Sequence, residues 1–289
     1  MERVFITGAY GQLGLALHHL MSGQDRYVVY RTDAVRSDEG IVHALDITDE
    51  AAVLKAVEEF HPDIIINCAA MTAVDLCETE QEKAYRINAL GTKYLAQAAN
   101  HCGAKLIHVS TDYVYDGQKD KPYVESDETN PISVYGRTKL EGELFALEIC
   151  PKTFILRTAW VYGEGKNFVK TMLRLAETGN PIRVVKDQFG SPTSALELAK
   201  VLLFLMDTDS YGIYHTTCEG STSWYEFAVR IFQLAGKDVQ VTAIPTSEYP
   251  TPAKRPMYSV LEKKALRERH GYIMKHWTEA IAEYIKDMK

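Results

Sequence analysis

Residues 3–14 read RVFITGAYGQLG, a short apolar run that leads into three glycines in a GxxGxxG pattern. The run predicts a buried strand, and the apolar spacing that follows predicts a helix over residues 12–22. Gly8, Gly11 and Gly14 suit a sharp turn between them, because glycine adopts backbone angles that other residues avoid. A pyrophosphate could approach the bare backbone N–H groups there, at the positive end of the helix dipole. A tight turn without a ligand is the alternative, but a place between strand and helix favours a dinucleotide.

Apolar strands and amphipathic helices alternate through the rest of the first half. We expect strands at residues 27–32, 41–45 (weak), 64–66, 105–111 and 153–159, and helices at 49–60, 79–101 and 133–148. This alternation is typical of a parallel sheet that is covered on both faces. The sequence therefore predicts an α/β chain with a doubly wound parallel sheet, the Rossmann fold.

The second half is less regular and contains several prolines. We expect helices at residues 166–178, 194–207, 222–235 and 276–287, and strands at 182–185, 212–216 and 239–244. Residues 1–160 are predicted to form a dinucleotide-binding Rossmann domain. Residues 161–289 are predicted to form mainly a smaller substrate-binding domain, with some segments returning to the Rossmann sheet. Open α/β sheets bind ligands at the carboxyl ends of their strands, so the second domain should lie over that edge.

The composition excludes several classes of protein. The 289 residues carry a formal net charge of −7, so no basic field invites nucleic acid. The five cysteines are odd in number and none are paired as CxxC, which favours reduced thiols in a cytoplasmic protein. No apolar run is long enough to cross a bilayer, and the start of the chain has no signal-peptide pattern. The nine histidines lack metal-binding spacings, so we predict no metal site.

Acidic residues after the second and third strands suit the adenosine end of a dinucleotide. Asp33 could accept hydrogen bonds from the ribose hydroxyls, which favours NADH. Arg31 and Arg36 flank it, and arginine suits the 2′-phosphate of NADPH, so both cofactors stay open. Asp46 and Ile47 end the third strand where contact with the adenine is expected. The alternative role for Asp46 is to cap the next helix.

A tyrosine, a lysine and a threonine form the candidate catalytic group. Tyr135 and Lys139 occur as YGRTK, and on a helix this spacing puts both side chains on one face. A nearby ammonium would lower the tyrosine pKa and suit it to acid–base work near neutral pH. Thr111, in STDYVYDG at residues 110–117, ends a predicted strand and could hydrogen-bond a substrate carbonyl. A chance surface pair is the alternative for YxxxK alone.

These motifs, with NCAA at residues 67–70, resemble the extended short-chain dehydrogenases, and most closely the dTDP-4-dehydrorhamnose reductase family. The resemblance covers nearly the whole chain. Four of its stretches lie in the second half: RTAWVYG at 157–163, NFVKTML at 167–173, DQFGSPT at 187–193 and PAKRPMYSVL at 252–261. It implies reduction of the C4 ketone of dTDP-4-dehydro-L-rhamnose to dTDP-L-rhamnose by NADPH or NADH. Thr111, Tyr135 and Lys139 would be the catalytic residues: Tyr135 protonates the C4 oxygen, and Lys139 holds the nicotinamide ribose.

The resemblance also assigns the binding residues. The cofactor set is Gly8, Gly11, Gln12, Leu13, Gly14, Asp33, Asp46, Ile47, Ala69, Ala70, Met71, Tyr135 and Lys139. The substrate set is Thr72, Val74, Thr111, Asp112, Trp160, Gln188 and Arg255. Trp160 would stack on the sugar, or else be a core aromatic.

The resemblance has further implications for Arg255, Asn88 and Met71, for Mg²⁺ and for the oligomeric state. Arg255 would pair with the diphosphate, or else form a structural salt bridge. Asn88 would support Lys139 through a helix kink and a water, or else lie on a solvated face. Met71 departs from the family, which often has His or Tyr there. Some members use Mg²⁺ at a dimer contact; we find no carboxylate cluster for it here, and a homodimer is a family-level expectation.

Two rival functions remain open at this point. One is a nucleotide-sugar epimerase or dehydratase of the same superfamily, which holds NAD⁺ tightly. The other is a non-catalytic regulatory subunit similar to the methionine adenosyltransferase beta subunit. The intact Thr111, Tyr135 and Lys139 favour an enzyme.

Overall fold

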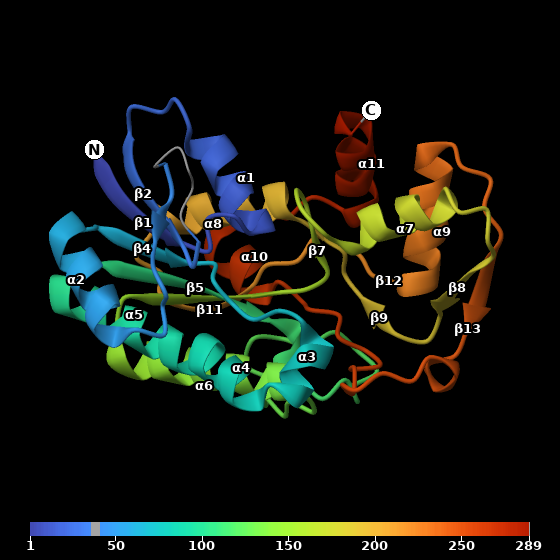
Figure 1. Ribbon diagram of the computed structural model, residues 1–289, viewed down its shortest axis with the longest axis horizontal. Helices are drawn as coiled ribbons and strands as arrows, with labels where there is room; N and C mark the ends of the chain where they lie inside the picture. The colour runs from blue at the N-terminus through green and yellow to red at the C-terminus, as the bar shows by residue number, and fades with distance from the viewer. Residues whose placement is uncertain (36–40, 289) are drawn as a thin grey trace.

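A parallel sheet forms the larger part of the molecule (Figure 1). In residues 1–35 and 41–288, which the computed structural model describes, seven parallel strands pair in the order β11-β6-β5-β4-β1-β2-β3. The strands are β1 Glu2–Thr7, β2 Tyr27–Asp33, β3 His43–Ala44, β4 Ile64–Asn67, β5 Lys105–Thr111, β6 Thr153–Thr158 and β11 Gly212–His215. The order reverses between β1 and β4, so the predicted doubly wound Rossmann sheet is confirmed.

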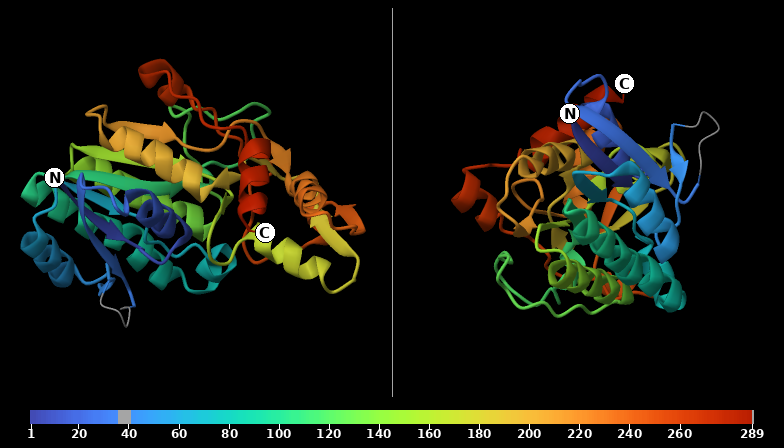
Figure 2. Two further views of the ribbon diagram at one scale, coloured as in Figure 1. Left: turned by 90° about the horizontal axis from the view of Figure 1, so that it is seen from above. Right: turned by 90° about the vertical axis from the view of Figure 1, so that its left-hand side faces the viewer.

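Helices cover both faces of this sheet (Figures 1 and 2). One face packs against α1 Gln12–Met21, α8 Ala195–Met206 and α10 Lys264–His270; the other packs against α2 Glu50–Phe60, α5 Gly91–Cys102 and α6 Val134–Ile149. Strand β4 shows why its sequence is continuously apolar. Ile64 and Ile66 belong to the core on the first face and Ile65 to the core on the second. A strand buried on both faces needs an apolar residue at every position.

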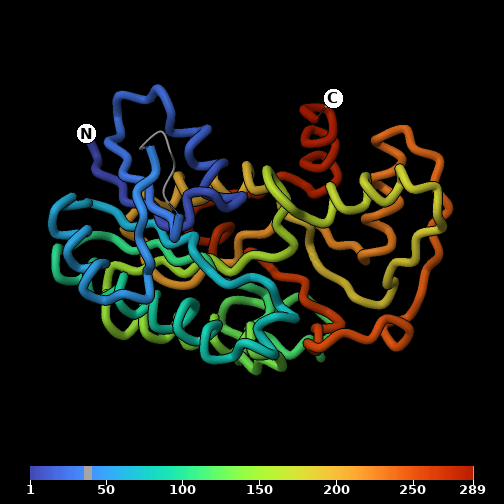
Figure 3. The backbone as a smooth tube through the Cα atoms, in the orientation of Figure 1, coloured from blue at the N-terminus to red at the C-terminus, as the bar shows by residue number. Residues whose placement is uncertain are grey.

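A second hydrophobic core lies beside the sheet, at the right of Figure 1. It is built by α7 Phe168–Ala176, β8 Ile182–Val185, α9 Trp224–Ala235, β13 Val241–Ile244 and α11 Trp277–Asp287, with η3 Thr246–Glu248 nearby. Short strand pairs connect it to the rest: β7 Val161–Tyr162 with β10 Thr193–Ser194, and β9 Phe189–Gly190 with β12 Thr222–Ser223. The chain leaves the sheet and rejoins it at β11 and α10 (Figure 3).

The helix expected over residues 79–101 begins earlier and is interrupted. It consists of α3 Val74–Thr79, α4 Gln81–Tyr85, the π-helical turn η1 Arg86–Leu90, and α5. A Cβ on Gly142 of α6 would lie 2.4 Å from the Asn88 carbonyl oxygen, so α6 packs directly on this wider turn. The turn is the kink expected at Asn88.

Other departures concern short elements. The weak strand expected at residues 41–45 is reduced to the two residues of β3. The helix α10 is not expected from the sequence, because its seven residues are too few to show an apolar period and several are basic. A short 3-10 turn, η2 Asp112–Val114, follows β5 directly.

Candidate active site

The glycine turn after β1 has the geometry of a backbone cradle. Gly8 has a φ of +67°, and a Cβ on it would lie 2.7 Å from the Ala69 nitrogen. A Cβ on Gly14 would lie 2.4 Å from the Gly8 oxygen. No side chain among the described residues caps the start of α1 at Gly11. Backbone N–H groups at the turn are therefore available to an anion, and the residues present fit a dinucleotide pyrophosphate.

The neighbouring predicted residues differ in their surroundings. Leu13 is buried in the core between α1 and the sheet, so its side chain points away from the cradle. The Gln12 amide nitrogen lies 3.4 Å from the Val161 oxygen. Within the described residues, its Oε1 is buried without a hydrogen-bond partner.

Asp33 lies at the end of β2 and braces the glycine turn. Its carboxylate accepts hydrogen bonds from the Tyr10 nitrogen at 3.0 Å and the Ala34 nitrogen at 2.8 Å. Burial lowers the pKa of Arg31, two residues earlier on the same strand. Arg36, the other arginine expected here, lies outside the described residues.

Asp46 and Ile47 follow β3, the strand that pairs with β2. Asp46 accepts from the Thr48 nitrogen at 2.9 Å and lines a pocket of about 790 Å³. The cap of α2 is Asp49, which accepts from the Ala52 nitrogen at 3.0 Å, so the capping alternative for Asp46 is wrong. Ile47 is buried, and a Cβ on Gly91 would lie 2.7 Å from it.

Thr111, Tyr135 and Lys139 come together between β5 and α6. Thr111 is the last residue of β5, and Ser133 caps α6 just before Tyr135 by accepting from the Gly136 nitrogen at 3.1 Å. All three side chains are buried. Thr111 Oγ1 donates to Asp112 Oδ1 at 3.0 Å and accepts from the Tyr113 nitrogen at 3.2 Å. The spacing of four on α6 puts Tyr135 and Lys139 one turn apart, as expected.

The pKa of Tyr135 moves in the direction opposite to the one expected from the sequence. Burial raises it well above its ordinary value, and the Asp112 and Cys77 side chains raise it further. The Thr111 side chain lowers it in part. The expectation of a lowered value is wrong because the Lys139 amino group is directed toward Val109 and His108 instead. At neutral pH, Tyr135 is thus a protonated phenol, which is the form that can donate a proton.

Lys139 points into the interior beneath the strand ends. Its Nζ donates to the Val109 oxygen at 2.7 Å and lies 3.2 Å from His108 Nε2. Burial lowers the pKa of Lys139 to about 8, and the charges of Glu143 and Cys68 work in the opposite direction. A modest change in surroundings can therefore alter the charge of this amine near neutral pH.

Asp112 follows Thr111 and is also buried. Its Oδ1 accepts from the Thr111 hydroxyl at 3.0 Å. Within the described part of the chain, its Oδ2 has no hydrogen-bond partner. Burial raises the pKa of Asp112 to about 6, although the hydroxyl groups of Ser259 and Thr111 lower it in part.

The segment after β4 is held by two asparagines. The Ala69 nitrogen donates to Asn67 Oδ1 at 3.2 Å, and the Met71 nitrogen donates to Asn88 Oδ1 at 2.8 Å. Asn88 Nδ2 donates to the Met71 oxygen at 3.2 Å and to Thr138 Oγ1 at 3.1 Å. Asn88 is fully buried, so the solvated-face alternative is wrong.

The rest of this segment leads to α3 and to a small apolar cluster that includes Met71, Val74 and Tyr135. Ala70 is half-buried, Thr72 is exposed and Val74 begins α3.

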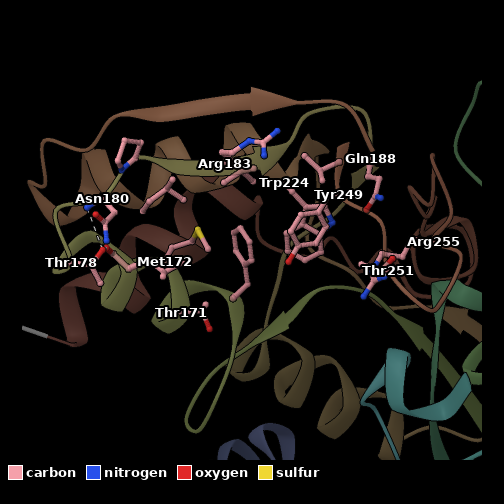
Figure 4. Close-up of a pocket in the computed structure, with 16 residues that line it drawn as sticks. Thr171, Met172, Thr178, Asn180, Arg183, Gln188, Trp224, Tyr249, Thr251 and Arg255 are labelled. Atoms are coloured by element: carbon pink, nitrogen blue, oxygen red, sulfur yellow. Dashed lines mark hydrogen bonds between the residues drawn. The ribbon is translucent and has the colours of Figure 1, made fainter. Parts of the chain in front are cut away.

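A pocket of about 570 Å³ opens in the region of the second core. In Figure 4, Thr178 and Asn180 lie at one end, Arg255 and Thr251 at the other, and Trp224 and Tyr249 between them. The lining is largely apolar and aromatic, which suits a flat organic ring. Nothing in the sequence patterns singles out Trp224 and Tyr249, because their shared surface exists only after α9 and the segment after η3 come together.

Of the predicted substrate residues, Gln188 and Arg255 line this pocket, and Trp160 contacts its wall at Trp224. Trp160 has a φ of +49° and stacks on Trp224, with ring centroids 3.5 Å apart, so one of its faces is covered. Gln188 lines the pocket and donates to Thr246 Oγ1 at 3.1 Å. Arg255 forms an ion pair with Asp75 of α3 at 2.8 Å, which is the structural alternative foreseen for it.

Among residues 1–35 and 41–288, no group of three or more His, Cys, Asp or Glu side chains could hold a metal ion, so Mg²⁺ gains no support. In the described part of the chain, no helix combines the length and the apolar character needed to span a membrane.

The whole chain is similar to one group of proteins. Residues 1–289 match the family model of the RmlD substrate binding domain. A dTDP-4-dehydrorhamnose reductase of Aggregatibacter actinomycetemcomitans is 43% identical, with 97% of each chain covered. The spore coat polysaccharide biosynthesis protein SpsK of Bacillus subtilis is 40% identical, with 99% of this chain and 98% of that protein covered.

Solved structures agree with these relatives. A dTDP-4-dehydrorhamnose reductase of Clostridium acetobutylicum is 49% identical, with a TM-score of 0.94 and 99% of each chain covered. That of Bacillus anthracis, solved in complex with NADP, is 40% identical with a TM-score of 0.92 and 99% of each chain covered.

Proposed function

The chain belongs to the RmlD substrate-binding family, that of the dTDP-4-dehydrorhamnose reductases, and we propose that it reduces the C4 ketone of dTDP-4-dehydro-L-rhamnose to dTDP-L-rhamnose with NADPH or NADH. The observation that carries this proposal is the convergence of Thr111, Tyr135 and Lys139 at the strand ends, next to the glycine turn. Relatives of full length supply the sugar and the nucleotide.

We assign the cofactor to the glycine turn and the ends of β1, β2 and β4. The backbone of the turn holds the pyrophosphate, and Asp33 and Asp46 lie on the adenosine side. Ala69, Ala70 and Met71 line the nicotinamide side. When bound, the reduced nicotinamide supplies a hydride to C4 of the sugar. A choice between NADH and NADPH depends on Asp33 and Arg31, which favour different riboses.

Tyr135 donates the proton that the C4 oxygen needs. Its raised pKa keeps the phenol protonated at neutral pH, so the proton is present before reaction. The phenolate that remains is buried and needs a positive charge nearby. Lys139 lies one turn along α6 and supplies that charge when its amine is protonated. Thr111, held by Asp112 and the Tyr113 nitrogen, offers a hydroxyl to the C4 oxygen beside Tyr135.

We propose that the second core carries the nucleotide. Trp224 and Tyr249 offer ring surfaces for the base, and Arg255 lies at the pocket end that adjoins α3. To meet a diphosphate, Arg255 would exchange part of its contact with Asp75 for phosphate oxygens, which its planar fork suits. Trp160 would keep one ring face for the sugar while Trp224 covers the other.

The direct test supplies dTDP-4-dehydro-L-rhamnose with NADPH or with NADH and follows the loss of absorbance of the reduced cofactor. Turnover with formation of dTDP-L-rhamnose supports the proposal. Stoichiometric NAD⁺ in the purified protein and no net reduction would support the epimerase or dehydratase rival. Absence of any turnover by the folded chain would support the regulatory rival.

The assignment of the proton donor is tested by Tyr135→Phe. We expect turnover to fall by about 10²- to 10⁴-fold, because the variant lacks the donated proton. Binding of NADPH should stay within a few-fold, measured by calorimetry. A variant that keeps most of its rate would show that another group protonates C4. A homodimer remains a prediction, which sedimentation of the purified chain measures.

A further inference from the structure

A buried histidine contacts Lys139, and the proposed reaction gives it no role. His108 of β5 is fully buried, with Nε2 3.2 Å from Lys139 Nζ and Nδ1 3.0 Å from Asn67 Nδ2. The Asn88 side chain bonds Met71 and Thr138, and its support of Lys139 through the kink and a water stays a prediction. The side chain that contacts Lys139 directly is His108.

The orientation of the Asn67 amide is fixed by two independent partners. The Ala69 N–H can only donate, so the atom that it meets at 3.2 Å is the amide oxygen. The Thr92 hydroxyl donates its hydrogen to the Asn88 oxygen at 2.8 Å. It must therefore accept from Asn67 Nδ2, which lies 3.3 Å away. With the amide held this way, Nδ2 also faces His108 and donates to it.

This orientation fixes the tautomer of His108. Because Nδ1 accepts from Asn67, it carries a lone pair and no hydrogen. Burial holds the pKa of His108 well below its usual value, so the ring is neutral. A neutral imidazole has one N–H, which must then be on Nε2 and point at Lys139.

An ammonium group has no lone pair, so it cannot accept from this N–H, whereas a neutral amine can. The neutral amine satisfies both contacts: it accepts from His108 Nε2 and donates to the Val109 oxygen. We propose that His108 is a positioning residue, which docks Lys139 as the neutral amine. When the amine takes a proton from solvent, it can no longer accept the hydrogen bond from His108 Nε2. Nζ is then free to move toward the cofactor and Tyr135.

The other charged and titratable groups around Lys139 favour the protonated form or are compensated. Glu143 lies one turn further along α6 and is paired with Arg157, and Cys68 follows β4. Tyr135 lies one turn before Lys139 on the same helix. Glu143 and Cys68 favour the ammonium, whereas burial favours the amine. The N–H of His108 adds a contact that only the amine can accept.

A second buried histidine provides an internal comparison. His215 of β11 lies with Nδ1 2.9 Å from the Glu262 oxygen and Nε2 2.8 Å from the Tyr115 hydroxyl. A carbonyl oxygen can only accept, so the hydrogen of His215 is on Nδ1. The two buried neutral histidines are therefore expected to have opposite tautomers.

The tautomers can be read from long-range ¹H–¹⁵N correlation spectra of protein labelled with [¹⁵N]histidine. We expect the ring that disappears in His108→Phe to be neutral and protonated on Nε2 across neutral pH. His108→Gln gives the same assignment if the phenylalanine variant does not fold. A proton on Nδ1 of His108, or a charged ring near pH 7, would overturn the proposal. This readout does not depend on the reaction.

The kinetic readout does rest on the proposed function, in which Lys139 acts as the ammonium. Phenylalanine at position 108 keeps ring volume but removes the N–H that favours the amine. We expect the alkaline limb of kcat/KM to move up by roughly 0.5 to 1 pH unit, the equivalent of one hydrogen bond. His101→Phe, at an exposed position on α5, is the matched control and should leave the limb in place. If His108→Phe is active and its alkaline limb of kcat/KM does not move, His108 does not tune the pKa of Lys139. If the wild type does not reduce the sugar, the proposed function is contradicted, but the tautomer of His108 is still tested by the spectra.

Discussion

The buried carboxylate of Asp112 lowers the stability of the folded state when it is ionised. One oxygen accepts from Thr111, and within the described residues the other has no partner. The folded state therefore binds a proton on Asp112 more tightly than the unfolded chain does, which raises its pKa from 3.8 to about 6. Because the folded pKa is the higher one, this group destabilises the fold as pH rises from about 4 to about 6, and the loss persists above that.

We expect Asp112→Asn to be more stable than the wild type at pH 7.5. An amide oxygen can still accept from Thr111, and the charge is gone. The interval between 3.8 and about 6 corresponds to about 3 kcal/mol as an upper limit. Urea unfolding at pH 7.5 and at pH 4 measures the effect, which should shrink at the lower pH. A difference that is the same at both values would show that ionisation of Asp112 is not its cause.

Single residues also show where prediction from sequence ends. Thr111, Tyr135 and Lys139 could be chosen because their spacing and strand-end position are local features. His108 and Asn67 could not be linked to Lys139, because their contact depends on how β4, β5 and α6 are aligned. The direction of the Tyr135 pKa was also beyond the sequence, since it depends on burial and on where the Lys139 side chain points.

At the scale of elements, α6 is held against the π-helical turn by a glycine. We expect Gly142→Ala to destabilise the fold by about 1–3 kcal/mol, because its Cβ would lie 2.4 Å from the Asn88 oxygen. Helix propensity alone would predict that Gly142→Ala raises the free energy of unfolding by about 1 kcal/mol. The sign of the measured change therefore shows whether the steric contact or the helix propensity dominates. Glu141→Ala, an exposed neighbour on α6, should stay within about 0.5 kcal/mol in the same urea unfolding experiment. A stabilised Gly142→Ala would show that α6 can shift away from η1.

The prediction of elements succeeds where periodicity is long and fails where packing overrides it. The buried strands β1, β4, β5 and β6 follow from apolar runs, and α2 from helical spacing. The π-helical turn inside residues 79–101 cannot be located from the apolar pattern, because its extra residue shifts the helical period by only one position. The pocket has the same limit, since its walls come from α7, α9 and the segment after η3.

For the whole molecule, two cores suggest two binding tasks that can be separated. The cofactor residues gather at the edge of the sheet, whereas the pocket with Trp224 and Tyr249 belongs to the second core. The division of the chain near residue 160 remains a prediction. If the two parts bind separately, a substitution among the cofactor residues should leave the affinity for the nucleotide of the substrate unchanged, and a substitution in the pocket should leave the affinity for the cofactor unchanged.

Tyr249→Ala and Asp33→Ala test this separation as a pair. Tyr249 is 56% exposed, so its removal should not unfold the chain. Loss of one ring that stacks on the base should weaken dTDP binding by about tenfold, while NADH binding stays within twofold. Asp33→Ala should do the reverse, because the ribose hydroxyls lose their acceptor. Calorimetry with dTDP and with NADH on both variants measures all four affinities. If either variant weakens both ligands equally, the two cores do not bind independently, and the sheet and the pocket form one cooperative site.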